Sequence, residues 1–161
     1  MKLGLVTMAI TCLFVSAQSQ TASGTTGHKP DTAERRVVKL PGAPPSSAPI
    51  SPAIVAGNFV FTSGQIGIDP KTGQMVEGGT AEQAEQVLLN LTAVLEAAGS
   101  SISHVLKATV FLADMNDYAA MNEVYRRHFK QDFPARSAVQ VAKLPANARI
   151  EIEAVAVLKK N

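Results

Sequence analysis

The residues best suited to chemistry lie in the last third of this chain. Arg136 opens an alternating segment, residues 136–141, and Glu151 and Glu153 alternate with apolar residues in the segment 149–158. An arginine with two carboxylates in reach forms ion pairs that need no substrate to explain them. The same planar guanidinium is also suited to bind the carboxylate of a small molecule through two parallel hydrogen bonds.

Several other kinds of site find no support in the sequence. A single cysteine excludes a disulfide framework and a zinc site built from clustered cysteines. The three histidines, His28, His104 and His128, form no pair at ligand spacing, so we expect no metal site. Ser63 follows a predicted strand, but no Ser-His-Asp arrangement surrounds it.

Length and charge limit the function further. The chain has 161 residues, the length of one ordinary domain. A domain of about 150 residues buries about 70% of its unfolded surface, so a core forms without a disulfide or a metal. The formal net charge is +2 and is spread along the chain. This charge does not predict nucleic-acid binding.

Residues 1–17 have the pattern of a secretory signal peptide. Lys2 precedes an apolar run, residues 3–15, and the small residue Ala17 ends the segment. The run is shorter than the ~20 apolar residues that a membrane-spanning helix needs. We therefore expect an exported protein, periplasmic or secreted, with no stable membrane anchor after cleavage. Cleavage after Ala17 removes Cys12 and with it any cysteine-based catalysis.

A polar segment, residues 18–36, follows the leader and is rich in Ser, Thr, Gly and Gln. With almost nothing apolar, it cannot offset the entropy cost of ordering, and we expect a disordered linker. Regular patterning begins at Val37, so the predicted folded domain spans residues 37–159.

This domain has the pattern of an α+β fold, a single sheet with two helices on one face. The first helix begins at a capping box of Thr80 and Gln83 and ends at Gly99. The second helix is capped by Asp117 and stopped by Pro134. The predicted strands are residues 37–40, 58–63, 105–112, 136–141 and 149–158. We expect the order β-β-α-β-α-β.

The last strand predicts an interface between copies of the chain. Alternation places its apolar residues, from Ile150 to Leu158, on the face that packs against the helices. The other face carries two carboxylates and two valines: Glu151, Glu153, Val155 and Val157. Two helices can cover only one side of the sheet. We therefore expect the second side to be a subunit interface of a homo-oligomer.

Two blocks of the domain resemble a known family. The Phe-Pro-Ala-Arg-Ser block that begins at Phe133, with the Ile-Glu-Ile-Glu block that begins at Ile150, looks like the signature of the RidA (YjgF) family, the reactive-intermediate deaminases. Supporting similarities lie in residues 62–66, 69–73 and 109–112. The resemblance covers about residues 37–158, which is the whole predicted domain and none of the leader.

The resemblance implies a chorismate-mutase-like fold and a homotrimer with three clefts between neighbouring subunits. It also implies an enzyme that hydrolyses short-lived enamines and imines, such as 2-aminoacrylate and 2-imino acids, to 2-oxo acids and ammonia. No cofactor is implied. The implied partners are other copies of the chain and the small substrates, which agrees with the interface expected from strand alternation.

The resemblance also implies roles for individual residues. Arg136 matches the family's carboxylate-binding arginine, and Glu151 matches the acidic residue that orients the attacking water and helps ammonia leave. Asn122 matches a substrate-contacting position, and Gly64 matches a backbone contact after the second predicted strand. Glu153 lies on the same strand face as Glu151, so either glutamate could be the base.

Two positions of the implied substrate pocket depart from the family pattern. Ile50 stands where a tyrosine is frequent, and Ala138 stands where a cysteine is frequent, two residues after the arginine. Loss of a hydroxyl and a thiol makes the pocket more apolar. We therefore expect it to accept substrates with longer aliphatic side chains.

A second function is compatible with the same residues. A non-enzymatic trimer that binds small carboxylates, or a holdase-like binder, would keep the cleft at Arg136 for ligand capture. Release of ammonia separates this alternative from the deaminase. Ribonuclease activity, a third reading based on some relatives, gains no support from the charge distribution.

Overall fold

The structure is a computed structural model of the chain and describes residues 34–42 and 48–160. The predicted leader and most of the predicted linker lie outside the described residues, so those two assignments stay predictions. Within the described ranges, no helix is long and apolar enough to cross a membrane.

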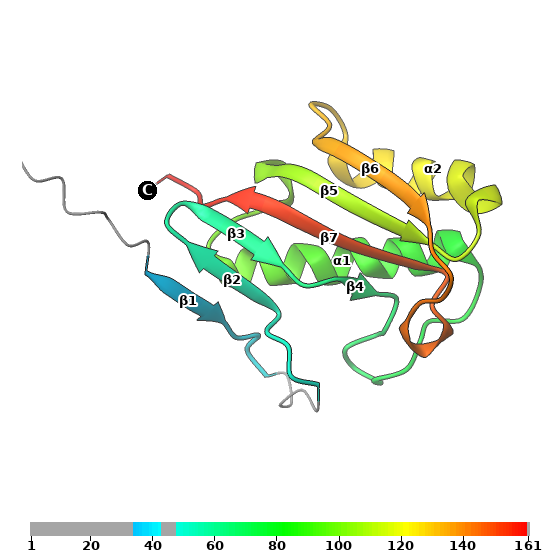
Figure 1. Cartoon of the computed structure of the whole chain (residues 1–161), viewed down its shortest axis with the longest axis horizontal. Helices are drawn as coiled ribbons and strands as arrows, with labels where there is room; N and C mark the ends of the chain where they lie inside the picture. Colours follow the sequence, from blue (N-terminus) through cyan, green and yellow to red (C-terminus); the bar gives the residue numbers. More distant parts are fainter. Residues whose placement is uncertain (1–33, 43–47, 161) are drawn as a thin grey trace, which may run out of the picture. The chain divides into compact units, whose positions relative to one another are not determined.

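One mixed sheet forms the frame of the domain (Figure 1). Its strands are β1 (Arg35–Val38), β2 (Ala53–Ala56), β3 (Phe59–Thr62), β4 (Gln65–Ile66), β5 (Val105–Leu112), β6 (Ala135–Gln140) and β7 (Ile150–Val157). Their order across the sheet is β1-β2-β3-β7-β5-β6, and β4 also pairs with β7. β5 and β6 are parallel, and the other neighbours are antiparallel. The last strand in the chain therefore lies inside the sheet.

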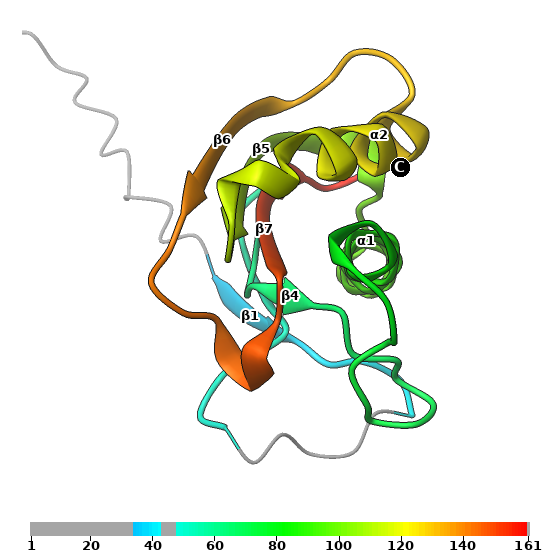
Figure 2. The ribbon, with the colours of Figure 1, turned by 90° about the vertical axis from the view of Figure 1, so that its right-hand side faces the viewer.

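Two helices cover one side of this sheet (Figure 2). They are α1 (Thr80–Ala98) and α2 (Tyr118–Phe129), and α2 connects β5 to its parallel neighbour β6. Short 3-10 turns lie at η1 (Ile102–His104), η2 (Met115–Asp117) and η3 (Pro145–Asn147). The apolar face of α1 is buried at Val87, Leu88, Leu91, Val94, Leu95 and Ala98. The predicted α+β fold with both helices on one face is confirmed.

The alternation predicted for the last strand is also confirmed. The helix-facing residues of β7 are almost fully buried: Ile150, Ile152, Ala154 and Ala156. Glu151 and Glu153 lie on the opposite side, which we call the open face of the sheet. Large apolar side chains of this face are exposed, with Phe59 at 45%, Phe61 at 46% and Val139 at 44%.

The observed order of elements is longer than the predicted β-β-α-β-α-β. β2 and β4 are additional strands, and the predicted strands 136–141 and 149–158, observed as β6 and β7, are two strands after α2 where that order has one. β2 and β3 form a hairpin in which Ala56 pairs with Phe59, so the loop is Gly57 and Asn58. Gly57 has a φ of +55°, a conformation that glycine adopts at little cost. A Gly-Asn pair between two apolar runs is a hairpin signal that could have revealed β2.

Strand boundaries agree with the sequence prediction to within one residue, except at the first strand. β1 begins at Arg35 rather than Val37, so Arg35 and Arg36 pair with β2. The side chain of Arg36 donates a hydrogen bond of 3.0 Å to the carbonyl of Ala98. This carbonyl belongs to the last turn of α1, where backbone acceptors have no partner within the helix.

The helix caps differ from the predicted ones. The N-cap of α1 is Gly79, whose N–H donates to the Glu82 carboxylate at 2.7 Å. The capping box of Thr80 with Gln83 is therefore wrong, and Thr80 is the first helical residue. Gly99 ends α1 as predicted, with a φ of +91°. Asp117 is the N-cap residue of α2, but its side chain makes no capping hydrogen bond.

Candidate functional site

Arg136 is held by three neutral side chains of α2. Its Nη2 donates to Asn122 Oδ1 at 2.7 Å and to the Tyr118 hydroxyl at 3.1 Å. Its Nη1 lies 3.6 Å from the sulfur of Met121. Positions 118, 121 and 122 lie on one side of the first turns of the helix, so the helix presents all three partners together. The geometry thus brings Asn122 together with Arg136, and its expected contact with substrate stays a prediction.

The ring of Tyr125 forms the floor beneath this guanidinium. The Arg136 Cζ atom lies 4.5 Å from the ring centroid, a cation–π contact, and Tyr125 stacks in turn on Phe129. Burial raises the pKa of Tyr125 to about 12. Its hydroxyl is buried and has no hydrogen-bond partner among the described residues. The ring therefore positions the guanidinium through its face rather than through its hydroxyl.

A cavity of about 430 Å³ opens beside Arg136, between α2 and β6. Ala138 and Phe133 contribute apolar wall, and Arg126 contributes a second cation. We call this the arginine cavity. Its volume is within the range of about 300–1,000 Å³ that is usual for sites that bind small molecules.

Arg136 has no carboxylate partner within the described parts of the chain. The ion pairs there involve other residues: Arg126 with Glu123, Arg127 and His128 with Glu85, and Arg149 with Asp117. The alternative that Arg136 pairs with Glu151 or Glu153 of its own chain is therefore wrong. A half-buried guanidinium held only by neutral groups attracts an anion.

Sheet geometry explains why the two glutamates are out of reach. Arg136 pairs with Ala108, which is fully buried beneath the helices. Glu151 pairs with Phe111, which pairs in turn with Val139 on the open face. Paired residues share a face and successive residues alternate. Arg136 and Glu151 therefore lie on opposite faces of one sheet.

The carboxylate of Glu151 lies directly against Gly64. A Cβ atom at position 64 would be 1.8 Å from Glu151 Oε1, so any side chain here must push the Glu151 carboxylate aside. Ile66 of β4 pairs with Glu151 of β7, and this pairing brings Gly64, two residues before Ile66, close to Glu151. Burial raises the pKa of Glu151, and the charge of Glu153 raises it further. A raised pKa suits a carboxyl group that exchanges protons in a reaction.

Ile50 belongs to the same side of the domain as Gly64. Its side chain is 60% exposed and lies in the segment before β2. The hydroxyl of Ser63 donates to the carbonyl of Ser51 at 2.7 Å, which holds this segment beside the residue that precedes Gly64. The six predicted site residues thus form two groups. Arg136, Asn122 and Ala138 belong to the arginine cavity, whereas Gly64, Glu151 and Ile50 form what we call the glutamate edge.

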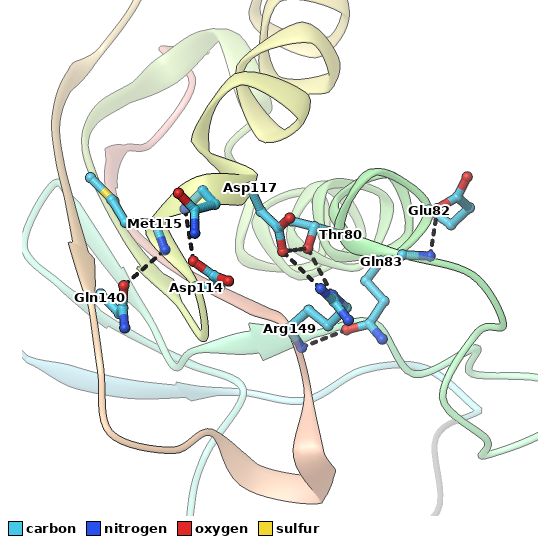
Figure 3. A network of polar contacts seen from close by, with 10 residues as sticks. Thr80, Glu82, Gln83, Asp114, Met115, Asp117, Gln140 and Arg149 are labelled. Carbon is cyan, nitrogen blue, oxygen red and sulfur yellow. Dashed lines mark hydrogen bonds and ion pairs between the residues drawn. The ribbon is translucent and has the colours of Figure 1, made fainter.

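A polar network joins the first residues of three elements (Figure 3). Arg149, just before β7, donates to Thr80 Oγ1 and to Asp117 Oδ2, each at 3.1 Å. Thr80 also hydrogen-bonds Asp117, and the Arg149 backbone N–H donates to Gln83 Oε1 at 2.8 Å. The hydrogen bond from Thr80 and then that from Arg149 lower the pKa of Asp117. The network fixes the start of α2, which carries Tyr118, relative to the strand that carries Glu151.

Sequence reasoning missed Tyr118, whereas Tyr125 is a buried core residue whose ring also contacts Arg136. Both lie in α2 and contact Arg136 of β6. The spacing of residues in the sequence does not predict a contact between two such elements. The i, i+4 relation of Tyr118 to Asn122 is the only available signal, because it puts both residues on one helix face.

The sequence model of the family described as endoribonuclease L-PSP matches residues 41–158. The Homo sapiens protein named 2-iminobutanoate/2-iminopropanoate deaminase is 50% identical over 123 residues, which are 76% of this chain and 90% of the relative.

The chain is also similar to solved structures, in sequence and in fold. RidA from the Antarctic bacterium Psychrobacter is 41% identical, with 76% of this chain and 99% of the other covered and a TM-score of 0.72. TdcF from E. coli, solved with bound serine, is 40% identical, with 77% and 99% covered and a TM-score of 0.72.

The contact between Gly64 and Glu151 leads to a first prediction. In Gly64→Ala, the new methyl group must displace the Glu151 carboxylate toward solvent, which lowers the pKa of Glu151 toward its usual value of 4.5. Unfolding free energy should fall by about 1 kcal/mol or less, because only the end of the flexible Glu151 side chain has to move. NMR titration of the carboxyl carbon and urea denaturation measure the two effects.

Gly79→Ala is the matched control for this prediction. A Cβ atom there would lie 3.5 Å from the Glu82 carboxylate, an ordinary contact, and Gly79 has a φ of −97°. We expect neither the Glu151 pKa nor the stability to change by much in this variant. An unchanged Glu151 pKa in Gly64→Ala would contradict the prediction.

Proposed function

The chain belongs to the RidA (YjgF) family, whose sequence model is described as endoribonuclease L-PSP, and from this membership we propose that it hydrolyses 2-imino acids and their enamine tautomers to 2-oxo acids and ammonia. The observation that carries this proposal is the guanidinium of Arg136, which has no carboxylate partner among the described residues and lies in a cavity of small-molecule size. The carboxylate of a 2-imino acid supplies the anion that this guanidinium lacks.

The reaction needs a water molecule, a proton carrier and a fixed carboxylate. The water oxygen adds to C2 while the electron pair of the C=N bond moves to nitrogen. A base takes a proton from the water and returns a proton to the nitrogen. The base then moves the hydroxyl proton of this intermediate to its nitrogen, and the C–N bond breaks with release of ammonia as the C=O bond forms. One imino acid and one water give one 2-oxo acid and one ammonia, with no change of oxidation state.

Glu151 is the proposed proton carrier, and its surroundings support the role. Gly64 allows the carboxylate to lie against bare backbone, and burial raises the pKa of Glu151 above its usual value. A carboxyl group with a raised pKa holds a proton more readily when it must protonate the leaving nitrogen. Arg136 meanwhile fixes the substrate so that C2 faces the water, and positioning of this kind supplies much of the acceleration.

One chain alone cannot bring both groups to one substrate, because Arg136 and Glu151 lie on opposite faces of the sheet. We therefore propose that each site lies between two copies, with the arginine cavity of one facing the glutamate edge of the next. The exposed apolar residues of the open face, Phe59, Phe61 and Val139, support an interface there. In a closed ring of three copies, every arginine cavity faces the glutamate edge of a neighbouring copy.

The family description names an endoribonuclease, but the described side chains give little support to ribonuclease chemistry. His104 hydrogen-bonds Ser101 and His128 hydrogen-bonds Glu85, and neither histidine lines the arginine cavity. The proposed deamination uses Arg136, which does line it. Export stays part of the proposal as well, and N-terminal sequencing of the protein recovered from cells would test cleavage after Ala17.

The central prediction concerns ammonia release. With an amino-acid oxidase supplying fresh 2-imino acids, the chain from Gln18 onward should accelerate the formation of ammonia and 2-oxo acid. Arg136→Ala should lower kcat/KM by about 100-fold or more, since it leaves the substrate carboxylate without its charged partner. Because Ile50 and Ala138 are apolar, substrates with longer aliphatic side chains should also react.

Arg127→Ala provides the matched control, because this exposed arginine of α2 pairs with Glu85 and does not line the cavity. Its rates should equal those of the wild type. If the folded wild-type protein gives no acceleration with any imino acid, the deaminase proposal is wrong and the carboxylate-binding alternative takes its place.

A pH profile distinguishes Glu151 from Glu153 as the base. If Glu151 is the base, activity falls as the pH drops through its raised pKa. Glu153→Gln removes the neighbouring negative charge, so the pKa of Glu151 should fall and the acidic limb should move to lower pH, with activity retained. Glu151→Gln should lower kcat by about 10²–10⁴-fold. The reverse pattern in the two variants would assign the base to Glu153.

Mixing two inactive variants tests the placement of the site between copies. Arg136→Ala and Glu151→Gln, refolded together in equal amounts, should regain about a quarter of the wild-type activity, because a site is intact only where each neighbour contributes its unmodified residue. The mass in solution should correspond to three chains. No recovery from well-folded mixed trimers would show that both residues act within one chain.

A further inference from the structure

Among the described residues, no acceptor is assigned to the hydroxyl proton of Tyr118. The residue begins α2 at the mouth of the arginine cavity, and it is 38% exposed. Its hydroxyl oxygen accepts a hydrogen bond of 3.1 Å from Arg136 Nη2. A guanidinium only donates, so the phenolic proton is not used in this contact. It is available to a ligand that enters the cavity.

The guanidinium of Arg136 cannot make a two-pronged contact with a carboxylate without rearranging these contacts. Nη2 carries two protons, and both have partners, Asn122 at 2.7 Å and Tyr118 at 3.1 Å. Two-pronged contact with a carboxylate uses neighbouring N–H groups, and either available fork of the guanidinium includes Nη2. One of the two contacts must therefore yield. The contact with Tyr118 is the longer, and so the weaker.

We propose that the Tyr118 hydroxyl is a specificity-determining group, an acceptor from Arg136 in the empty cavity and a donor to the substrate carboxylate in the occupied one. This inference deepens the proposed function, on which it rests for the identity of the substrate. Once the contact between Arg136 Nη2 and Tyr118 breaks, the phenolic O–H and the freed N–H of Nη2 lie side by side. A carboxylate there receives hydrogen bonds from both, and each is strengthened because the acceptor is charged.

The electrostatic surroundings agree with this role. The amide of Asn122 and then the guanidinium of Arg136 lower the pKa of Tyr118, so the same groups that favour a phenolate also favour a bound carboxylate. The other ionisable groups that line the cavity are Arg126, which pairs with Glu123, and Tyr125, whose pKa is raised to about 12. In the proposed trimer, Glu151 of a second copy also faces the substrate.

Tyr118→Phe removes only the hydroxyl and keeps the ring. Calorimetry with 2-oxobutanoate, the product expected from 2-iminobutanoate, should show binding to this variant weakened about tenfold, the effect of losing one hydrogen bond to a charged group. Binding of 2-oxobutanamide, which has no carboxylate, should be the same in variant and wild type. In turnover, KM should rise by a similar factor while kcat changes little.

Alkaline pH gives an independent readout. A Tyr118 phenolate would repel the substrate carboxylate, so KM of the wild-type protein should rise as the phenol ionises, and KM of Tyr118→Phe should not. Arg127→Ala, which removes a nearby exposed charge outside the cavity, should bind 2-oxobutanoate like the wild type. The denaturation midpoint and the mass of each variant confirm that it is folded and assembled.

Three results would overturn the inference: undiminished binding of 2-oxobutanoate by Tyr118→Phe, equal losses for 2-oxobutanoate and 2-oxobutanamide, or no binding of 2-oxobutanoate to the wild type at millimolar concentration. The binding measurements need no turnover. A wild-type protein that binds the carboxylate through Tyr118 but releases no ammonia would contradict the proposed function and leave this inference standing.

Discussion

Side-chain alternation in a sheet that is covered on one side governs the arrangement of the whole site. β7 lies between β3 and β5, and its residues point in turn to the helices and to the open face. The apolar residues of β7 pack against α1, and this packing fixes the register of the strands that pair with β7. The polar half places Glu151 away from the side of the sheet that holds Arg136. A single constraint thus builds the core and divides the site into two groups.

Each of the two groups has its own support. At the arginine cavity, α2 supplies a hydrogen-bonding amide, a phenol and an aromatic floor, and none of these neutralises the guanidinium. At the glutamate edge, Gly64 has no side chain and so leaves room for the carboxylate of Glu151. Burial and the negative charge of Glu153 raise the pKa of Glu151. The network of Thr80, Asp117 and Arg149 spans both, because Asp117 precedes α2 and Arg149 precedes β7. An exposed ion pair of this kind adds little to stability, so its main effect is on position.

Local patterns in the sequence identify most of the fold. The helical face of α1, the end of that helix at Gly99 and strand β5 follow from periodicity and from turn chemistry, which act between residues close in the chain. The failures share a cause. β2 is only four residues long beside a proline-rich stretch, β4 only two, and Thr80 resembles a cap in sequence while a glycine occupies the cap in space. Elements this short owe their conformation to the strands they pair with, and a local pattern does not contain that information.

The sequence by itself determined which residues could carry the proposed chemistry and that one face of the sheet is left uncovered by the helices, because alternation and residue type are both local properties. Only the tertiary structure decided how those residues are grouped. It separated Arg136 from Glu151, joined Glu151 to Gly64, and placed Tyr118 and Tyr125 around the guanidinium. These relations depend on which strands pair and in which register. Pairing is set by the burial of the whole core, so no single segment can specify it.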